Sequence, residues 1–262
     1  MRLELLYNVR LMCERLAAES NKRRRLAKLR RTPAQSLSLG HIDSLELLEL
    51  AQRLTISVIY DVGANVGTWC LLAKAIFPQA NIHAFEPLPK HHDQFLINMT
   101  HVTDVELHRV ALGSENEAAV LHETDFSDAS SMLELSEAGK KQWGIQEVEQ
   151  LPIQLRRLDD YRAANDLPWP DLIKLDVQGL ELEVLKGARR CIETAKAVIS
   201  EVSFVEYYRG QCLFHELVNH MAEAGLFISG FGCSTPVGVP IGQTDVLFAR
   251  QPTDLAAHIN ST

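Results

Sequence analysis

The chain has few of the features that mark membrane-embedded or secreted proteins. Its 262 residues contain no run of about 18 apolar residues, the length that a membrane-spanning helix needs. The N-terminus lacks the apolar core and the small-residue cleavage site of a secretory signal. The five cysteines are scattered, odd in number and without a CxxC pair. These absences predict a cytoplasmic protein with reduced thiols.

Several signatures of catalysis are also missing. No group of His and Cys residues has the spacing of a zinc site, so the sequence predicts no bound metal. The chain has neither a G-x-S-x-G nucleophile turn nor a Walker A phosphate loop. These absences argue against a serine hydrolase of that type and against a P-loop nucleotide hydrolase.

Positive charge is scarce outside the first 31 residues. That segment carries ten Lys or Arg and three Glu, a balance of +7, whereas the remainder has sixteen basic and thirty-one acidic residues, a balance of −15. An acidic surface repels a polyanion, so nucleic acid is excluded as a partner of the main domain. The basic run at 22–31 fits either a solvated helical face or an arm that docks on an anionic membrane or an acidic partner.

Strand-like and helix-like segments alternate through the rest of the chain. We expect helices at 1–31 and 43–51, followed by strands and helices in turn. The expected strands lie at 56–61, 81–86, 105–111, 171–177 and 197–202, and the expected helices between or after them at 68–77, 89–99, 181–190 and 213–224. Such alternation predicts an α/β fold with a mainly parallel sheet covered on both faces. Two last strands, at 226–229 and 245–249, have no helix between them and predict an antiparallel hairpin at one sheet edge.

One stretch interrupts this rhythm. Residues 118–124 and 151–157 alternate like exposed strands, and a polar loop at 125–131 lies between them. A long insertion of this kind is often functional, so we expect the 115–160 insertion and the 230–243 loop to determine specificity. We divide the chain into an N-terminal helical extension at 1–52, a main domain at 53–252 and a tail at 253–262.

The strongest functional signal is a glycine-rich turn after the first expected strand. It reads Asp61-Val62-Gly63-Ala64-Asn65-Val66-Gly67, and the second expected strand ends in an acid, Glu86. Glycines let the backbone approach a ligand closely, and a carboxylate accepts hydrogen bonds from ribose hydroxyls. The pattern predicts a nucleoside site built from Asp61, Gly63, Ala64, Asn65, Gly67 and Glu86.

The residues of this turn favour one cofactor over another. Nicotinamide enzymes usually carry G-x-G-x-x-G, and the third glycine is missing here. An aspartate at position 61 repels a pyrophosphate but suits a cationic ligand. S-adenosylmethionine combines an ammonium, a sulfonium and a ribose without phosphate, so Asp61 and Glu86 match its charges. An acid that only caps the turn is the alternative for Asp61.

Taken together, the motifs resemble the FkbM family of S-adenosylmethionine-dependent methyltransferases over about residues 56–250. The resemblance rests on the glycine turn, on Phe85-Glu86-Pro87, Ser130-Ser131 and Leu158-Asp159, on the segment from Ile173 to Gly187, and on Glu201 and Asp245. It implies a class I Rossmann-like fold with a seven-stranded sheet, and a reaction that usually methylates a hydroxyl. Gln178 departs from the family, which commonly has Glu there, and this weakens any acidic or metal-binding role at that position.

Several residues are candidates for the chemistry. Asp176, at the end of the fourth expected strand, is the first candidate for the base, with a helix cap as the alternative. Glu201 ends the fifth strand and would orient the acceptor or, with Asp176, hold a divalent cation. His215 is a further candidate base, and a packing role is its alternative. We place Ala111 and Leu112 near the adenine, and Ser131 near the cofactor carboxylate or an acceptor hydroxyl. We expect Glu181 to act as a structural cap.

These interpretations converge on one leading hypothesis. The chain would transfer a methyl group from S-adenosylmethionine to a hydroxyl of a small metabolite, sugar or natural-product scaffold. A non-catalytic module that binds the cofactor is the second hypothesis, and an NAD-linked oxidoreductase is the third. The sequence leaves the acceptor and the oligomeric state open.

Overall fold

The computed structural model describes residues 20–125, 129–235 and 241–250. Of the expected helix at 1–31, only the part from residue 20 onward lies within the described residues, and there residues 20–28 are helical. Part of the polar loop at 125–131, part of the 230–243 loop and the tail at 253–262 also lie outside the described residues.

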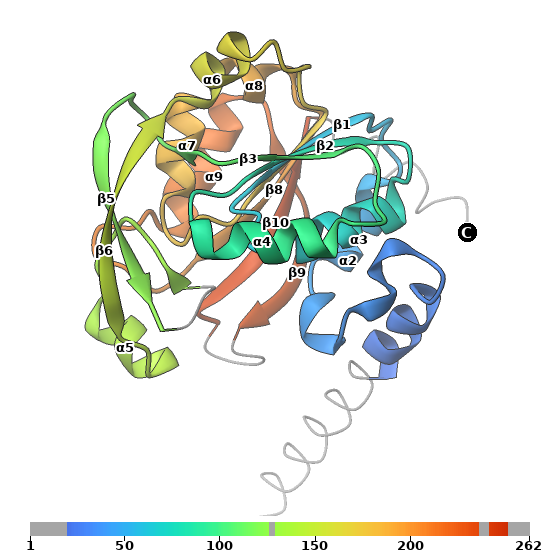
Figure 1. The fold of residues 1–262 in the computed structure, drawn as a ribbon, viewed down its shortest axis with the longest axis horizontal. Helices are drawn as coiled ribbons and strands as arrows, with labels where there is room; N and C mark the ends of the chain where they lie inside the picture. Colours follow the sequence, from blue (N-terminus) through green and yellow to red (C-terminus); the bar gives the residue numbers. More distant parts are fainter. Residues whose placement is uncertain (1–19, 126–128, 236–240, 251–262) are drawn as a thin grey trace, which may run out of the picture.

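A seven-stranded sheet forms the centre of the molecule (Figure 1). The strand order is β3-β2-β1-β7-β8-β10-β9. The bounds are β1 Val58–Val62, β2 Asn81–Phe85, β3 Val105–His108, β7 Leu172–Leu175, β8 Ala197–Ser203, β9 Phe227–Thr235 and β10 Gln243–Ala249. The pairs from β3 to β8 are parallel, whereas β10 pairs antiparallel with both β8 and β9. The predicted mainly parallel sheet with a late antiparallel hairpin is confirmed.

Helices cover both faces of this sheet, because its central strands are apolar on both sides. Figure 1 shows α2, α3 and α4 on one face and α6 and α8 on the other. The first layer comprises α2 Leu45–Ala51, α3 Thr68–Ile76 and α4 Pro89–Asn98, and the second comprises α6 Leu158–Ala164, α7 Glu181–Gly187, α8 Arg189–Thr194 and α9 Phe214–Glu223. Each layer closes its own hydrophobic core against the sheet. The two cores fix the sheet from both sides and so hold the ends of its strands in place.

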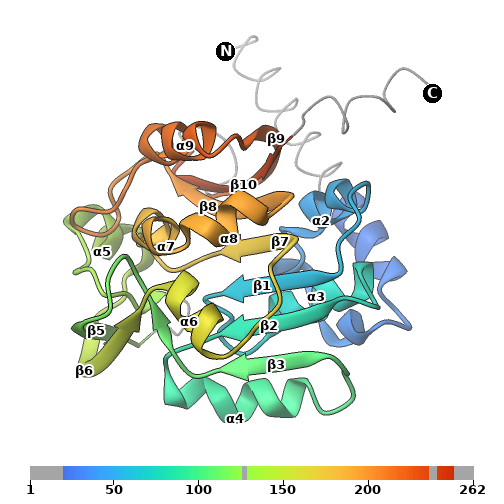
Figure 2. The ribbon, with the colours of Figure 1, turned by 90° about the horizontal axis from the view of Figure 1, so that it is seen from above.

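The insertion forms a small second sheet beyond the carboxyl ends of the central strands. β5 Ala118–Thr124 and β6 Glu147–Arg156 pair antiparallel, and the short β4 Ala111–Leu112 adds to β6. In Figure 2 this sheet lies at the side toward which the arrows of β1, β2 and β3 point. α5 Glu137–Trp143, which the sequence analysis did not predict, follows β5. The insertion is therefore placed where parallel sheets bind ligands.

Three predicted elements need correction. The strand expected at 226–229 continues to Thr235 as β9, into the stretch that was expected to be a loop. The third strand does not continue to Ala111, because β3 ends at His108 and a tight turn, with Val110 N–H donating to the His108 carbonyl at 3.0 Å, redirects the chain into the second sheet. The predicted single helix at 181–190 is two helices that meet at Ala188. Gly187 sits so close to the Gly113 carbonyl that an added Cβ would lie 2.0 Å from its oxygen. This close packing fixes the position of the bend.

The N-terminal extension packs onto the domain through a helix at 20–28, two 3-10 turns and α2. The turns are η1 Pro33–Ser36 and η2 Leu39–His41. Part of the basic run pairs with acids of the α2 region: Lys22 with Asp43, Arg25 with Glu46 and Glu49, and Lys28 with Glu49. Docking of this segment on a membrane or partner stays a prediction, and these internal pairs use some of its charge. Among the helices of the described ranges, none combines the length and apolar character needed to cross a bilayer.

Candidate cofactor-binding and active site

The glycine turn after β1 leaves no room for a side chain at its two glycines, Gly63 and Gly67. Gly63 has φ +81°, and a Cβ there would lie 1.9 Å from the backbone oxygen of Asp176. The Gly63 and Ala64 N–H groups both donate to the Phe85 carbonyl, at 3.0 and 3.1 Å. Gly67, with φ +83°, begins α3, and a Cβ there would meet Phe95 and Met99. Glycine at 63 is therefore required both by its backbone conformation and by the approach of β7's end.

Glu86, the acid after β2, is held by the backbone around it. Its Oε2 accepts from the Asn65 N–H at 2.9 Å, and its Oε1 accepts from the Leu88 N–H at 2.8 Å. His91 Nδ1 lies 3.1 Å from the same Oε1. An ionised carboxylate has about four acceptor positions, so these contacts orient Glu86 without using all of its capacity. It remains able to accept hydrogen bonds from a ligand.

A cavity of about 490 Å³ opens over these elements. Its volume lies within the usual range of about 300–1,000 Å³ for small-molecule sites. The predicted site residues in its lining are Gly63, Asn65, Glu86, Ala111, Leu112, Ser131 and Asp176. The predicted residues outside its lining are Asp61, Ala64, Gly67, Glu201 and His215. The structure thus brings cofactor candidates from β1, β2, β4 and the insertion together with the first candidate base.

Asp61 lies beneath the cavity rather than in its wall. Its side chain has 0% exposure, accepts a hydrogen bond from Cys70 Sγ at 3.0 Å, and lies 3.5 Å from Lys174 Nζ. Burial raises the pKa of Asp61, and Lys174 opposes that rise. Asp61 is therefore connected to the cavity indirectly, through Lys174, which lines it.

Lys174, on β7, connects the buried Asp61 to Asp176, the first candidate for the base. Its Nζ lies 3.3 Å from Asp176 Oδ2 and donates to the Gly63 carbonyl at 3.3 Å. Burial alone would lower the pKa of Lys174, but Asp176, Asp61 and Asp245 outweigh burial and raise it above its usual range. The lysine is thus a fixed cation that joins Asp61, the glycine turn and Asp176.

Asp176 is the carboxylate of this network that reaches the cavity. Its side chain is 37% exposed. Gln178 Nε2 donates to Asp176 Oδ1 at 2.6 Å, while Gln178 Oε1 accepts from the Tyr208 hydroxyl at 2.9 Å. An ionised glutamate at position 178 could not donate to Asp176 and would repel it. The glutamine that departs from the family pattern therefore has a definite role here, which is to orient the Asp176 carboxylate.

Further acids lie close behind this wall. Burial raises the pKa of Glu201, with added repulsion from Asp176, Asp245 and Glu181, and Gln243 Nε2 donates to Glu201 Oε1. Burial raises the pKa of Glu181 to about 7, although its Oε1 accepts from the Val177 and Gly179 N–H groups at 3.0 and 3.2 Å. Those two bonds match the capping role expected for Glu181.

The other predicted site residues have simpler surroundings. The Ser131 hydroxyl donates to the Gln178 carbonyl at 2.7 Å and accepts from the Leu133 N–H at 3.1 Å. His215 is exposed on α9. Ser131 therefore joins the insertion to the segment that carries Asp176, whereas His215 faces solvent.

The sequence analysis missed several residues of this site. Gly40, His41 and Ser44 of the N-terminal extension line the cavity, as do Trp69 and Lys174. The sequence could have indicated Lys174, because a lysine within an apolar strand is buried only when an acidic partner pairs with it. Nothing in the local sequence of the extension indicates that it reaches the cavity.

The fold and site together define a class of protein. A parallel sheet that ends in an antiparallel hairpin, with a glycine turn after β1 and an acid after β2, is the arrangement of a class I S-adenosylmethionine-dependent methyltransferase. The chain belongs to the FkbM methyltransferase family: the model described as "Methyltransferase FkbM domain" matches residues 61–227, well over half of the chain. The family expected from the motifs is thus confirmed.

Two curated relatives illustrate the family. The chain is 28% identical to the 2-O-methyltransferase NoeI of Sinorhizobium fredii, over 69% of this chain and 75% of that protein. It is 29% identical to the hexuronic acid methyltransferase AglP of Haloferax volcanii, over 62% of each. The chain thus spans less than two thirds of the length of some curated relatives, AglP among them.

Among solved structures, this chain has a weaker similarity in fold to fibrillarin from Aeropyrum pernix with bound S-adenosyl-L-methionine. Its TM-score is 0.44 at 11% identity, covering 79% of this chain and 76% of the fibrillarin chain.

Proposed function

We propose that this chain transfers the methyl group of S-adenosylmethionine to a hydroxyl of a small acceptor, and that sugars are the first class to test. One observation carries the proposal: Glu86, oriented by the glycine turn, and Asp176, oriented by Lys174 and Gln178, line the same cavity. The names of the relatives NoeI and AglP, a 2-O-methyltransferase and a hexuronic acid methyltransferase, support the acceptor class.

The lining fits this cofactor better than a dinucleotide. Glu86 retains acceptor capacity for ribose hydroxyls, and Gly63 lets the ligand approach the backbone. Among the described residues in the lining, Lys174 is the only Lys or Arg, and its ammonium lies against Asp61 and Asp176. A pyrophosphate would therefore meet two carboxylates without an available cation, which disfavours the NAD-linked alternative.

Different residues of the chain would bind the cofactor and remove the proton of the acceptor. When bound, S-adenosylmethionine supplies a methyl group on a sulfonium, which is already an excellent leaving group. Glu86 would accept hydrogen bonds from the ribose, and the apolar side chains of Ala111 and Leu112 would lie against the adenine. Asp176 would take the hydroxyl proton of the acceptor, whose oxygen gains the methyl group as the methyl–sulfur bond breaks. The main contribution of the protein is alignment, and the base adds about 10²–10⁴-fold.

We retain Asp176 as the base because it lines the cavity. Glu201 and His215 lie outside the lining, so we do not assign proton removal from the acceptor to either of them. Asp176→Asn should reduce methyl transfer by about 10²–10⁴-fold with little change in cofactor affinity. His215→Gln, at an exposed position, should leave the rate unchanged.

Calorimetric titration with S-adenosylhomocysteine tests the cofactor site. Glu86→Ala removes charge-assisted hydrogen bonds and should weaken binding by about 10- to 100-fold. Glu123→Ala, a carboxylate on β5 that pairs with Lys90 at 2.6 Å, is a control outside the lining and should bind normally. Equal affinity in Glu86→Ala, or heat with NADH instead of S-adenosylhomocysteine, would contradict the proposal.

A panel of sugars with labelled S-adenosylmethionine tests turnover. Transfer of label to a hydroxyl supports the enzyme, and binding without transfer to any of the hydroxylated acceptors would favour the non-catalytic module.

We also retain two predictions from the sequence, the division at residues 52 and 252 and a cytoplasmic location. The described part of the extension contributes Gly40, His41 and Ser44 to the cavity lining, so the extension would take part in the site although it precedes the division at residue 52.

A further inference from the structure

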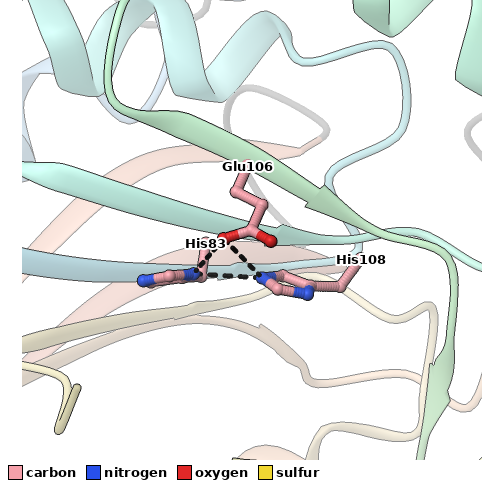
Figure 3. A group of neighbouring side chains, drawn as sticks. All are labelled: His83, Glu106 and His108. Carbon is pink, nitrogen blue, oxygen red and sulfur yellow. Dashed lines mark hydrogen bonds and ion pairs between the residues drawn. The ribbon is translucent and has the colours of Figure 1, made fainter. Parts of the chain in front are cut away.

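Two neighbouring strands at one edge of the sheet bring together a group of metal-binding side chains. His83 on β2 lies opposite Glu106 on β3 in the parallel register, and His108 follows two residues later on β3. Because side chains two residues apart share a face of a strand, Glu106 and His108 point to the same side as His83. Figure 3 shows the two imidazole rings edge to edge, with the Glu106 carboxylate over the gap between them.

The three facing atoms have the spacing of ligands around one ion. His83 Nδ1 and His108 Nε2 lie 3.0 Å apart, and Glu106 Oε2 lies 3.5 Å from the first and 3.9 Å from the second. In the plane of the three atoms, the point equidistant from them lies about 2.0 Å from each, and a tetrahedral ion would lie slightly off this plane. Zinc binds imidazole nitrogen at about 2.0–2.1 Å and carboxylate oxygen at about 2.0–2.2 Å. An ion would therefore fit with only small movements.

Neighbouring side chains hold the two imidazoles in place. His83 and His108 are buried. The Tyr161 hydroxyl lies 3.3 Å from His108 Nδ1. His108 Nε2 is hydrogen-bonded to His83 Nδ1 in the structure, so a metal ion would replace that bond, while the Tyr161 hydroxyl would hold the other ring nitrogen as outer-shell partners of metal-bound imidazoles do.

The third ligand faces solvent. The Glu106 side chain is 64% exposed, since β3 is the edge strand of the sheet. An ion can therefore enter without unfolding, and water can take the fourth position of a tetrahedral site. Two imidazoles and one carboxylate suit zinc and related transition metals, whereas magnesium and calcium prefer oxygen ligands alone.

We propose that His83, Glu106 and His108 form a binding site for one divalent transition-metal ion of the zinc type, separate from the methyl-transfer site. The ion would link β3 to β2 and so stabilise the edge of the sheet. His108 stacks on Phe85 with ring centroids 4.9 Å apart, and Phe85 lines the cavity. The bound metal would thus also hold the cavity wall on this side.

Titration of the metal-free, untagged protein tests the proposal. Calorimetry with Zn²⁺ should show one site per chain, and Co²⁺ should give the intense visible absorption of tetrahedral coordination. Glu106→Gln should weaken Zn²⁺ binding at least tenfold, and His83→Gln should remove the Co²⁺ bands. Glu115→Gln and His101→Gln, at exposed positions outside the cluster, are the matched controls and should bind as the native protein does.

Thermal unfolding gives a second measurement. Zn²⁺ should raise the melting temperature of the native protein and of the controls, but not that of Glu106→Gln. Because Glu106 is exposed, its variant should fold normally, and unchanged S-adenosylhomocysteine binding and circular dichroism would verify this. The proposal is overturned if Zn²⁺ binds Glu106→Gln and His83→Gln as it binds the native protein, or if the native protein binds no Zn²⁺ at micromolar concentrations.

Discussion

Removal of the Lys174 ammonium is the sharpest test of the buried charge network. In Lys174→Met the stem of the side chain is retained, but Asp61 keeps only the Cys70 hydrogen bond at 3.0 Å. The lysine lies 3.5 Å from Asp61 and 3.3 Å from Asp176, and Asp61 has no exposed surface. Breaking a buried pair from one side typically costs about 3–5 kcal/mol, and we expect a loss of this size at pH 7.

The double variant Asp61→Asn, Lys174→Met isolates the cause. An amide costs less to bury than an unpaired carboxylate, so this variant should regain on the order of 2 kcal/mol over Lys174→Met. Urea unfolding followed by circular dichroism measures both values. A loss below about 1 kcal/mol in Lys174→Met, or a double variant no more stable than the single one, would refute the reasoning.

The pH dependence supplies an independent check. Burial already raises the pKa of Asp61 in the native protein, and without Lys174 the rise is no longer opposed. A group whose pKa is higher in the folded than in the unfolded state stabilises the fold at low pH and loses that contribution as pH rises. The stability of Lys174→Met, relative to the native protein, should therefore fall as pH rises above about 3.9, the pKa of an unfolded aspartate, by up to about 1.4 kcal/mol per pH unit until Asp61 is ionised.

The native protein should lose part of its stability at alkaline pH. Asp176, Asp61 and Asp245 raise the pKa of Lys174 against the effect of burial. The contribution of this group is thus fully present below its unfolded pKa, about 10.4, and declines as pH rises above it. Lys174→Met should lack this alkaline decline, as unfolding at pH 9 and pH 11 would show.

Three further predictions concern other parts of the molecule. Gly63→Ala should abolish S-adenosylhomocysteine binding and destabilise the fold far more than Gly210→Ala, which shares a positive φ of +76° but has open space around it; equal losses by urea unfolding would contradict this. Gln178→Glu replaces the amide that donates to Asp176 with a second carboxylate, so the pH–rate profile should move to higher pH; an unchanged profile would argue against Asp176 as the base. If the basic segment docks on anionic vesicles, replacing three of its exposed arginines, Arg24, Arg30 and Arg31, with Gln should weaken binding to sedimented vesicles by about 1 kcal/mol per residue, and no change would exclude docking.

Local sequence was sufficient where one rule dominates. The expected strands at 56–61, 171–177 and 197–202 coincide closely with β1, β7 and β8, because central parallel strands must be apolar on both faces. The expected strand at 118–124 is β5, residue for residue. The hairpin at the end of the sheet followed from the missing helix between two apolar runs.

Local sequence was insufficient where a distant contact decides the conformation. The predicted single helix is divided at Ala188, next to Gly187, which the Gly113 carbonyl approaches too closely for a side chain. The third strand ends at His108 because the next residues pair with β6, which comes more than 30 residues later. Neither partner can be recognised from the sequence around the element that it shapes.

The sequence by itself determined the α/β class, the glycine turn and the acid after the second strand, since each depends on residues close together in the chain. Tertiary structure alone decided which side chains meet. Asp61 lies beneath the cavity because Lys174, from a strand more than 100 residues later, pairs with it. His83 faces Glu106 and His108 because β2 and β3 pair in one register. Parallel pairing joins residues through crossovers of varying length, so no spacing in the sequence reveals these contacts.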